Sequence, residues 1–215
     1  MSVKTLHYIY DPLCGWCYGI APFIQAAHKQ GVTIALHGGG MITGSQRRPA
    51  DDSMREMIRN HNQRITQLTG QPFTDAFYTL LKNQEWVIDS VPPIAAILSA
   101  QAQSGKGIDM LEACQKAYYQ DGLPLNRDTL RRLADKLGIS DIQSDNTEQH
   151  IHESRQLFVH NPTGGFPTLL LEEDGAFQHI PNQAVLGAES HWERLIPLLK
   201  TTALHQSHHH NHPRN

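Results

Sequence analysis

The sequence predicts a mixed α/β fold whose sheet is divided by an all-helical insertion. Three observations predict it. Strand-like alternation is confined to the two ends of the 215-residue chain, and helical periodicity fills the middle. In addition, a strand, a helix and a second strand follow one another within residues 6–36, in the order of a parallel βαβ unit.

The N-terminal βαβ unit has clear boundaries in the sequence. The first strand is predicted over residues 6–10, and the second, rich in β-branched residues, over residues 32–36. Between them the segment Cys14–Cys17 begins a helical pattern that runs to Gln30. Pro22 lies inside this pattern, so we expect the helix to be kinked there.

Helices and a final hairpin account for the rest of the chain. A hairpin is predicted over residues 168–180 and a closing helix over residues 187–204. Six helices are predicted before the hairpin, over residues 54–68, 73–81, 94–103, 108–119, 128–137 and 147–159.

These elements suggest a division of the chain into domains. We expect a discontinuous α/β domain made of residues 1–44 and 160–204, with a helical insertion over residues 45–159. The His-rich tail, residues 205–215, has no apolar pattern and is expected to be disordered.

Composition limits the classes of partner. The formal charge is −3 and the pI is about 6.5, with no basic stripe for nucleic acid. No apolar run has the length of a membrane span, and the first residues do not resemble a signal peptide. We therefore expect a cytoplasmic protein without nucleic-acid or membrane partners.

Cys14 and Cys17 lie three residues apart at the start of the predicted helix. Residues at this spacing on a helix are about 5–6 Å apart, within the Cα separation that a disulfide requires. The unpaired backbone N–H groups of a first helical turn favour a thiolate over a thiol. We therefore expect Cys14 to be the nucleophile and Cys17, one turn deeper, to resolve the mixed disulfide.

Two other uses of the cysteine pair remain open. The pair could supply half of a zinc site, but a structural zinc ion usually needs a second close pair. The only other cysteine, Cys114, lies far along the chain and is expected to be a buried apolar residue. The pair could also form an inert structural disulfide. No metal and no organic cofactor are expected, because thiol–disulfide exchange uses the sulfur atoms alone.

Two motifs carry a resemblance to a known family. The segment Cys14–Pro22, with a proline five positions after the second cysteine, resembles the active-site helix of the thioredoxin superfamily. Gly164–Thr168 resembles the loop that in this superfamily holds a cis-proline opposite the cysteines, here at Phe166–Pro167. With the helical insertion, the chain resembles the DsbA-like branch. The resemblance implies a thioredoxin-like fold and a thiol–disulfide oxidoreductase, similar to protein disulfide isomerases.

The resemblance also implies substrates and leaves alternatives. Polypeptides or small thiols and disulfides are the expected partners, with glutathione as one candidate. The strongly oxidising DsbA carries a histidine between its cysteines, whereas this chain has Gly15 and Trp16, so we expect a weaker oxidant. The architecture is also similar to kappa-class glutathione transferases and 2-hydroxychromene-2-carboxylate isomerases, which use a single serine or cysteine. A non-catalytic module that binds a metal or a partner is the remaining alternative.

Five further residues are candidates for the site. Trp16, which we expect to be exposed, could line it for substrate, with Tyr18 as either a rim or a core residue. The Phe166 backbone, held by Pro167, could pair with an extended substrate. Asp11 is either the initiator of an Asp-Pro turn or a relay for the proton that Cys17 must lose.

Overall fold

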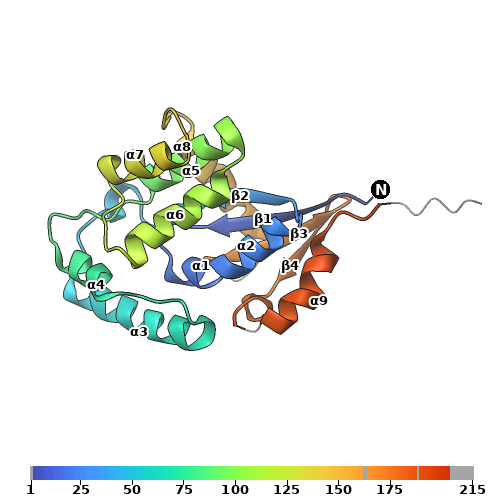
Figure 1. Cartoon of the computed structure of the whole chain (residues 1–215), viewed down its shortest axis with the longest axis horizontal. Helices are drawn as coiled ribbons and strands as arrows, with labels where there is room; N and C mark the ends of the chain where they lie inside the picture. The colour runs from blue at the N-terminus through green and yellow to red at the C-terminus, as the bar shows by residue number, and fades with distance from the viewer. Residues whose placement is uncertain (1, 162–163, 188, 204–215) are drawn as a thin grey trace, which may run out of the picture.

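A computed structural model describes residues 2–161, 164–187 and 189–203. Its four-stranded sheet has the order β2-β1-β3-β4 and joins the two ends of the chain (Figure 1). β1 pairs in parallel with β2 and antiparallel with β3, and β3 and β4 form an antiparallel hairpin. The predicted α/β class is confirmed. The strand bounds are β1 (Lys4–Tyr10), β2 (Ile34–Gly38), β3 (Thr168–Glu173) and β4 (Ala176–Ile180).

The helix after β1 differs from the prediction of one kinked helix. The structure has two, α1 (Gly15–Gly19) and α2 (Ala21–Lys29), separated at Ile20. The break has a local reason, because Pro22 lacks an N–H group and fits best in the first turn of a new helix. The reactive segment thus forms a short helix of its own.

Six helices lie between β2 and β3, as predicted. In Figure 1, α3 and α4 lie together on one side of the molecule, and α5 to α8 form a separate group. The domain boundaries at residues 44–45 and 159–160 stay a prediction. The helices are α3 (Asp52–Thr69), α4 (Asp75–Lys82), α5 (Val91–Ser104), α6 (Gly107–Tyr119), α7 (Arg127–Lys136) and α8 (Thr147–Gln156), the last followed by a 3₁₀ turn, Leu157–His160.

The sheet has two different faces, because side chains alternate along each strand. Tyr8 and Tyr10 are fully buried on the face that carries the cysteine helix, and the Tyr8 hydroxyl donates a hydrogen bond to the Cys17 carbonyl. His7 lies on the other face, where it meets His37 of β2. The cysteines therefore sit over the apolar face of the sheet.

The C-terminal part is shorter than predicted. The closing helix α9 (Glu189–Leu199) packs Trp192 edge-on against Phe23 of α2. The chain then returns toward the start of β1, where Thr202 forms an isolated antiparallel bridge with Ser2. The predicted disordered tail over residues 205–215 lies outside the described residues.

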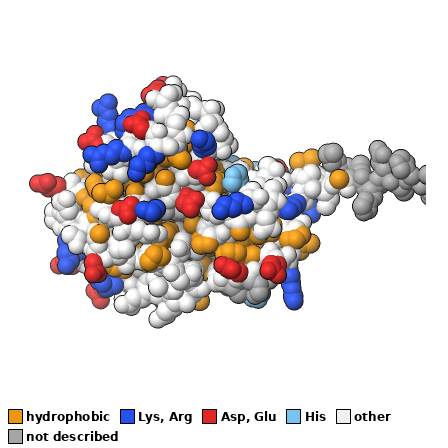
Figure 2. All heavy atoms as spheres, in the orientation of Figure 1, with side chains coloured by type: hydrophobic (Ala, Val, Ile, Leu, Met, Phe, Trp, Pro, Cys, Tyr) orange, Lys and Arg blue, Asp and Glu red, His pale blue; other side chains and the backbone are white. Residues whose placement is uncertain are grey.

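Charges of both signs alternate over the face shown in Figure 2. Within the part of the chain that the structure describes, no helix is long and apolar enough to cross a lipid bilayer.

Candidate active site

The two cysteines occupy different positions on α1. Cys14 is the N-cap, in extended conformation, and its backbone carbonyl accepts the Tyr18 N–H at 3.1 Å. Cys17 lies inside the helix. Both are free thiols; Cys14 retains 6% exposure and Cys17 none. Cys14 is therefore the more accessible of the two cysteines.

The surroundings of Cys17 keep its sulfur protonated. Burial raises the pKa of the Cys17 thiol well above that of a free cysteine. Its hydrogen bond with Cys14 and the charge of Cys14 raise the pKa further, whereas a hydrogen bond from the Asp11 backbone lowers it by more than the negative charge of Asp11 raises it. Burial thus favours the neutral thiol form of Cys17.

Asp11 is a fully buried carboxyl group that ties three segments together. Its Oδ1 accepts the backbone N–H of Leu13 at 2.9 Å and the Ser90 hydroxyl at 3.1 Å, and its Oδ2 accepts the Met41 N–H at 2.7 Å. Burial raises the pKa of Asp11 to about 6, although these hydrogen bonds and Arg155 act against the rise. Asp11 is therefore a turn residue that also lies within electrostatic range of Cys17.

The Phe166–Pro167 loop lies against the outer cysteine. Its peptide bond is cis, and the Cys14 thiol donates to the Phe166 carbonyl at 3.7 Å. The amide of Asn182 holds the Pro167 carbonyl at 3.2 Å. The Phe166 ring fills the space above Gly39, where an added Cβ would lie 2.1 Å from the ring. Phe166 therefore joins two distant segments near Cys14: its carbonyl accepts the thiol, and its ring packs on Gly39.

A largely apolar cavity of about 250 Å³ opens beside Cys14. Cys14 lines it, whereas Cys17 does not. One wall is helix α3, which belongs to the segment predicted as an insertion. Besides Cys14, its walls include Trp16, Met41, Met54, Met57, Ile58, Asn62, Ile65 and Phe166.

The expectation that Trp16 is exposed was wrong, because α3 covers it. The Trp16 side chain is half-buried, and its Nε1–H donates to Nδ1 of His61 at 3.3 Å. The guanidinium of Arg64 lies 5.4 Å from the Trp16 ring. Tyr18 is buried, and its hydroxyl donates to the Pro72 carbonyl at 2.9 Å, so it belongs to the core.

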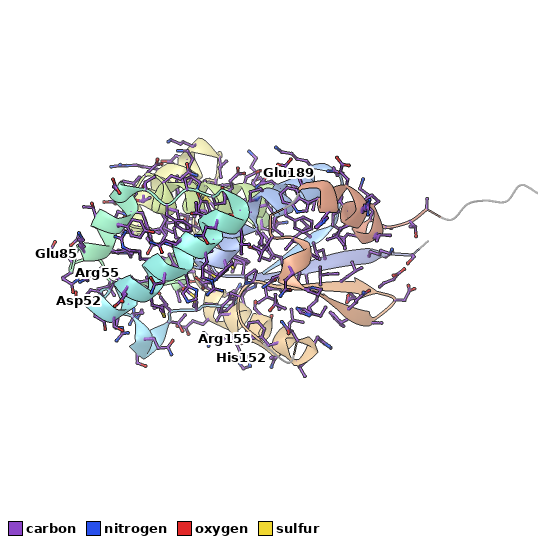
Figure 3. All side chains as sticks on the ribbon, turned by 90° about the horizontal axis from the view of Figure 1, so that it is seen from below. Asp52, Arg55, Glu85, His152, Arg155 and Glu189 are labelled. Atoms are coloured by element: carbon purple, nitrogen blue, oxygen red, sulfur yellow. The ribbon has the colours of Figure 1, made fainter. Side chains whose placement is uncertain are left out.

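Sequence reasoning missed the residues that later segments bring to the site. Arg155 of α8 donates to the carbonyls of Gly39 at 2.7 Å and Gly40 at 2.5 Å, which fixes the loop after β2 (Figure 3). Ser90 reaches Asp11 from the start of α5, and Asn62 reaches the cavity from α3. The alternation and helical periods used to predict elements carry no signal for such long-range contacts.

Cys114 and the His7–His37 pair lie apart from this arrangement. Burial alone raises the pKa of Cys114 to about 12, so it is an inert core residue. His7 and His37 lie 2.8 Å apart on the opposite face of the sheet, and burial lowers the pKa of His37 to about 4. Among residues 2–161, 164–187 and 189–203, no group of three or more histidine, cysteine or acidic side chains is arranged to hold a metal ion.

Comparisons with known proteins were made at three levels. No protein-family model matches the sequence. No curated protein matches it. Among solved structures, the chain is similar to the cytosolic disulfide reductase DsbM from Pseudomonas aeruginosa. The identity is 38%, 90% of this chain and 97% of that chain are covered, and the TM-score is 0.82.

Two further solved structures extend this result. One is the same reductase with GSH, at 37% identity, with 90% and 98% coverage and a TM-score of 0.81. The other, from Nitrosomonas europaea, is assigned as a protein disulfide isomerase. It is 25% identical, with 91% and 97% coverage and a TM-score of 0.74. The chain therefore belongs to the DsbA-like family and is a thiol–disulfide oxidoreductase.

Proposed function

We propose that Cys14 and Cys17 are the redox pair of this oxidoreductase, with Cys14 as the nucleophile. One observation carries the proposal: Cys14 lines the cavity and contacts the Phe166 carbonyl, whereas Cys17 is fully buried and does not line it. A disulfide that enters the cavity meets the Cys14 sulfur first. Cys17 can then attack only a disulfide that Cys14 has already formed.

The proposed reaction is two successive thiol–disulfide exchanges. The Cys14 thiolate attacks one sulfur of the substrate disulfide and releases the other as a thiolate, which takes up a proton. Cys17 then loses its proton, attacks Cys14 in the mixed disulfide and releases the second substrate thiol. The protein ends with a Cys14–Cys17 disulfide, and the substrate has gained two electrons and two protons. The reverse sequence oxidises a dithiol.

We assign Asp11 the role of proton relay in the second exchange. Cys17 has a raised pKa and must be deprotonated to attack. With a pKa of about 6, the Asp11 carboxyl is mostly ionised at neutral pH and lies within electrostatic range of Cys17. A buried carboxylate of this kind is a suitable proton acceptor.

The substrates are proposed to be polypeptides or small thiols and disulfides, with glutathione among them, and the working compartment the cytoplasm. The related DsbM is described as cytosolic and with GSH. Trp16, Phe166 and Pro167 are the proposed substrate-binding residues. Trp16 and Phe166 line the cavity, and the backbone at Phe166 and Pro167 lies beside Cys14.

A trapping experiment tests the separate roles that we assign to Cys14 and Cys17. Cys17→Ala should accumulate mixed disulfides at Cys14, visible on non-reducing gels and by mass spectrometry, whereas Cys14→Ala should form none. Cys114→Ala is the matched control and should exchange like wild type, because that thiol is buried away from the cavity. Equal trapping by the Cys14 and Cys17 variants would refute the assignment. Catalysed glutathione transfer by Cys17→Ala would instead favour the single-cysteine transferase chemistry.

A further inference from the structure

Asn62 is a buried polar residue in the wall of a cavity that is lined mostly by apolar side chains. It lies on α3, is 3% exposed and lines the same cavity as Cys14. Its neighbours along that wall are Ile58 and Ile65. A buried amide among apolar side chains is unfavourable unless its hydrogen bonds are made.

The carboxamide of Asn62 has one long hydrogen bond. Its Nδ2 donates to the Tyr78 hydroxyl at 3.4 Å, and within the described residues its Oδ1 accepts none. Oδ1 lies over the reactive segment, 3.0 Å from where a Cβ on Gly15 would be. A side chain at position 15 would therefore crowd this end of the amide. Either orientation of the carboxamide leaves one end directed to Tyr78 and the other over Gly15.

We propose that Asn62 binds an amide group of the substrate next to its reacting sulfur. A carboxamide offers one acceptor and one donor in a plane, which complements the N–H and C=O of a peptide group. Cys14, Asn62 and Phe166 line the same cavity, and the Phe166 carbonyl accepts the Cys14 thiol at 3.7 Å, so a substrate cysteine bound at Cys14 lies in a cavity that carries both polar groups. This inference rests on the proposed function and names the class of substrate: cysteine derivatives flanked by amides.

The volume of the cavity limits how much of a substrate can lie beside Asn62. At about 250 Å³ it is smaller than the roughly 300–1,000 Å³ of pockets for drug-sized ligands. It therefore takes the reacting cysteine and its adjacent amide, and the rest of the substrate stays outside. Glutathione and a polypeptide both supply this chemistry, and an experiment can separate the two sources.

The test substitutes Asn62→Leu, which is similar in size and removes both polar groups. The reduced protein is mixed with increasing concentrations of a disulfide, and its oxidation to the Cys14–Cys17 disulfide is followed by rapid quenching and thiol alkylation. Saturation gives an apparent KM and a limiting rate. Three disulfides are compared: glutathione disulfide, insulin, and bis(2-hydroxyethyl) disulfide, which has no amide. Asn60→Leu is the matched control, because Asn60 lies on the same helix but is exposed and does not line the cavity.

We expect Asn62→Leu to raise the KM for amide-bearing disulfides roughly tenfold, the effect of one or two lost hydrogen bonds, with a smaller change in the limiting rate. The kinetics with bis(2-hydroxyethyl) disulfide should be unchanged. A rise in KM for glutathione disulfide alone would identify a small thiol as the molecule that binds in the cavity. A rise in KM for insulin alone would identify a polypeptide. Thermal unfolding should show equal or higher stability for the variant, because a partly unsatisfied buried amide is lost.

Other outcomes would overturn the inference. Unchanged KM values for both amide-bearing disulfides would mean that Asn62 only packs against Tyr78. An equal rise in KM with all three disulfides, or the same rise in Asn60→Leu, would show a general effect on helix α3. If wild-type protein exchanges with none of the three, the proposed function itself fails, which is a result distinct from these.

Discussion

At the scale of single residues, the two thiols of the proposed redox pair differ in environment more than their spacing suggests. Cys14 lies before the first helical residue and faces a cavity, whereas Cys17 is enclosed next to the Asp11 carboxyl and the fully buried Tyr8. The ionised form of Cys17 is unfavourable there. The order of the two exchanges that we propose therefore follows from burial, and the proposed second exchange depends on removing a proton from a closed site.

Asp11→Asn should remove the pH dependence of this second exchange. In wild type, decay of the mixed disulfide should accelerate as the pH rises through about 6, because the Asp11 carboxyl then ionises and accepts the Cys17 proton. In Asp11→Asn this rise should vanish, and decay at pH 7 should be at least roughly tenfold slower. Rapid quenching with mass spectrometry between pH 5 and 8 measures it.

Ser90→Ala is the control for that experiment. The Ser90 hydroxyl lowers the pKa of Asp11 by donating a hydrogen bond, so its loss should move the midpoint of the profile upward without abolishing it. Identical profiles for wild type and Asp11→Asn would leave Asp11 as a turn residue only.

The two residues between the cysteines should influence the reduction potential of the Cys14–Cys17 pair. Gly15 and Trp16 provide no cation beside Cys14, so we expect a potential between those of thioredoxin and DsbA, about −270 to −120 mV. Trp16→His should raise it, because an imidazolium would stabilise the thiolate and so the reduced form. Equilibration with glutathione buffers measures the potential. Trp16→Phe controls for the loss of contacts with α3, and an equal shift in both variants would contradict the electrostatic explanation.

At the scale of elements, the site depends on the loop after β2 and the loop before β3. Gly39 has ordinary backbone angles, so its lack of a side chain matters for space: the Phe166 ring occupies the position of a Cβ. Arg155 holds the Gly39 and Gly40 carbonyls from α8. The position of Phe166 beside Cys14 is therefore set by three segments together.

Gly39→Ala should displace the Phe166 loop and impair catalysis. The added methyl would lie 2.1 Å from the ring, so ring and loop must move. We expect a stability loss of about 1–3 kcal/mol and a lower kcat/KM for disulfide reduction. Chemical denaturation and steady-state kinetics measure both.

A second substitution provides the control. Phe166→Ala in the Gly39→Ala background removes the clash and should recover part of the stability, giving a favourable coupling energy in a double-mutant cycle. Additive effects of the two substitutions on the free energy of unfolding would show that contact with the Phe166 ring is not what destabilises Gly39→Ala.

The sequence predicted the elements well and their contacts poorly. The Cys14–Cys17 motif and the period-2 strands are local patterns, and the structure has a helix and strands there. Helix α3 was predicted from the helical spacing of its apolar residues, but this spacing indicates only that one face of the helix is buried. It does not show that the face covers Trp16, which was expected to be exposed. The break at Ile20 also escaped prediction, because Pro22 fits both a kink and a new first turn.

At the scale of the whole molecule, burial shifts the pKa values of two titratable groups of opposite kind, Asp11 just after β1 and His37 in β2. Burial raises the pKa of Asp11 from 3.8 to about 6, which favours its neutral form. Burial also lowers the pKa of His37 from 6.5 to about 4, again favouring the neutral form. The same physical cause makes the two groups respond to pH in opposite directions, so their effects on folding largely cancel between pH 4 and 6.5.

Unfolding measured against pH should reveal this cancellation. Protonated Asp11 contributes stability that is fully present below pH 3.8 and lost as the pH rises through about 6. Neutral His37 contributes stability that is present above pH 6.5 and lost as the pH falls through about 4. At about 1.4 kcal/mol per pKa unit, each shift is worth roughly 3 kcal/mol. These two groups should therefore give wild type a nearly flat profile over this range.

Removing either group should tilt the profile. As the pH rises from 4 to 6.5, the free energy of unfolding of Asp11→Asn should increase by about 3 kcal/mol, because only the His37 contribution remains. Over the same range, that of His37→Phe should decrease by a similar amount, because only the Asp11 contribution remains. Urea unfolding at half-unit pH intervals measures the slopes, and the comparison with wild type cancels contributions from other groups. Asp145→Asn, at an exposed position, should keep the wild-type slope. If both variants also keep it, neither group is held neutral by burial in the folded protein.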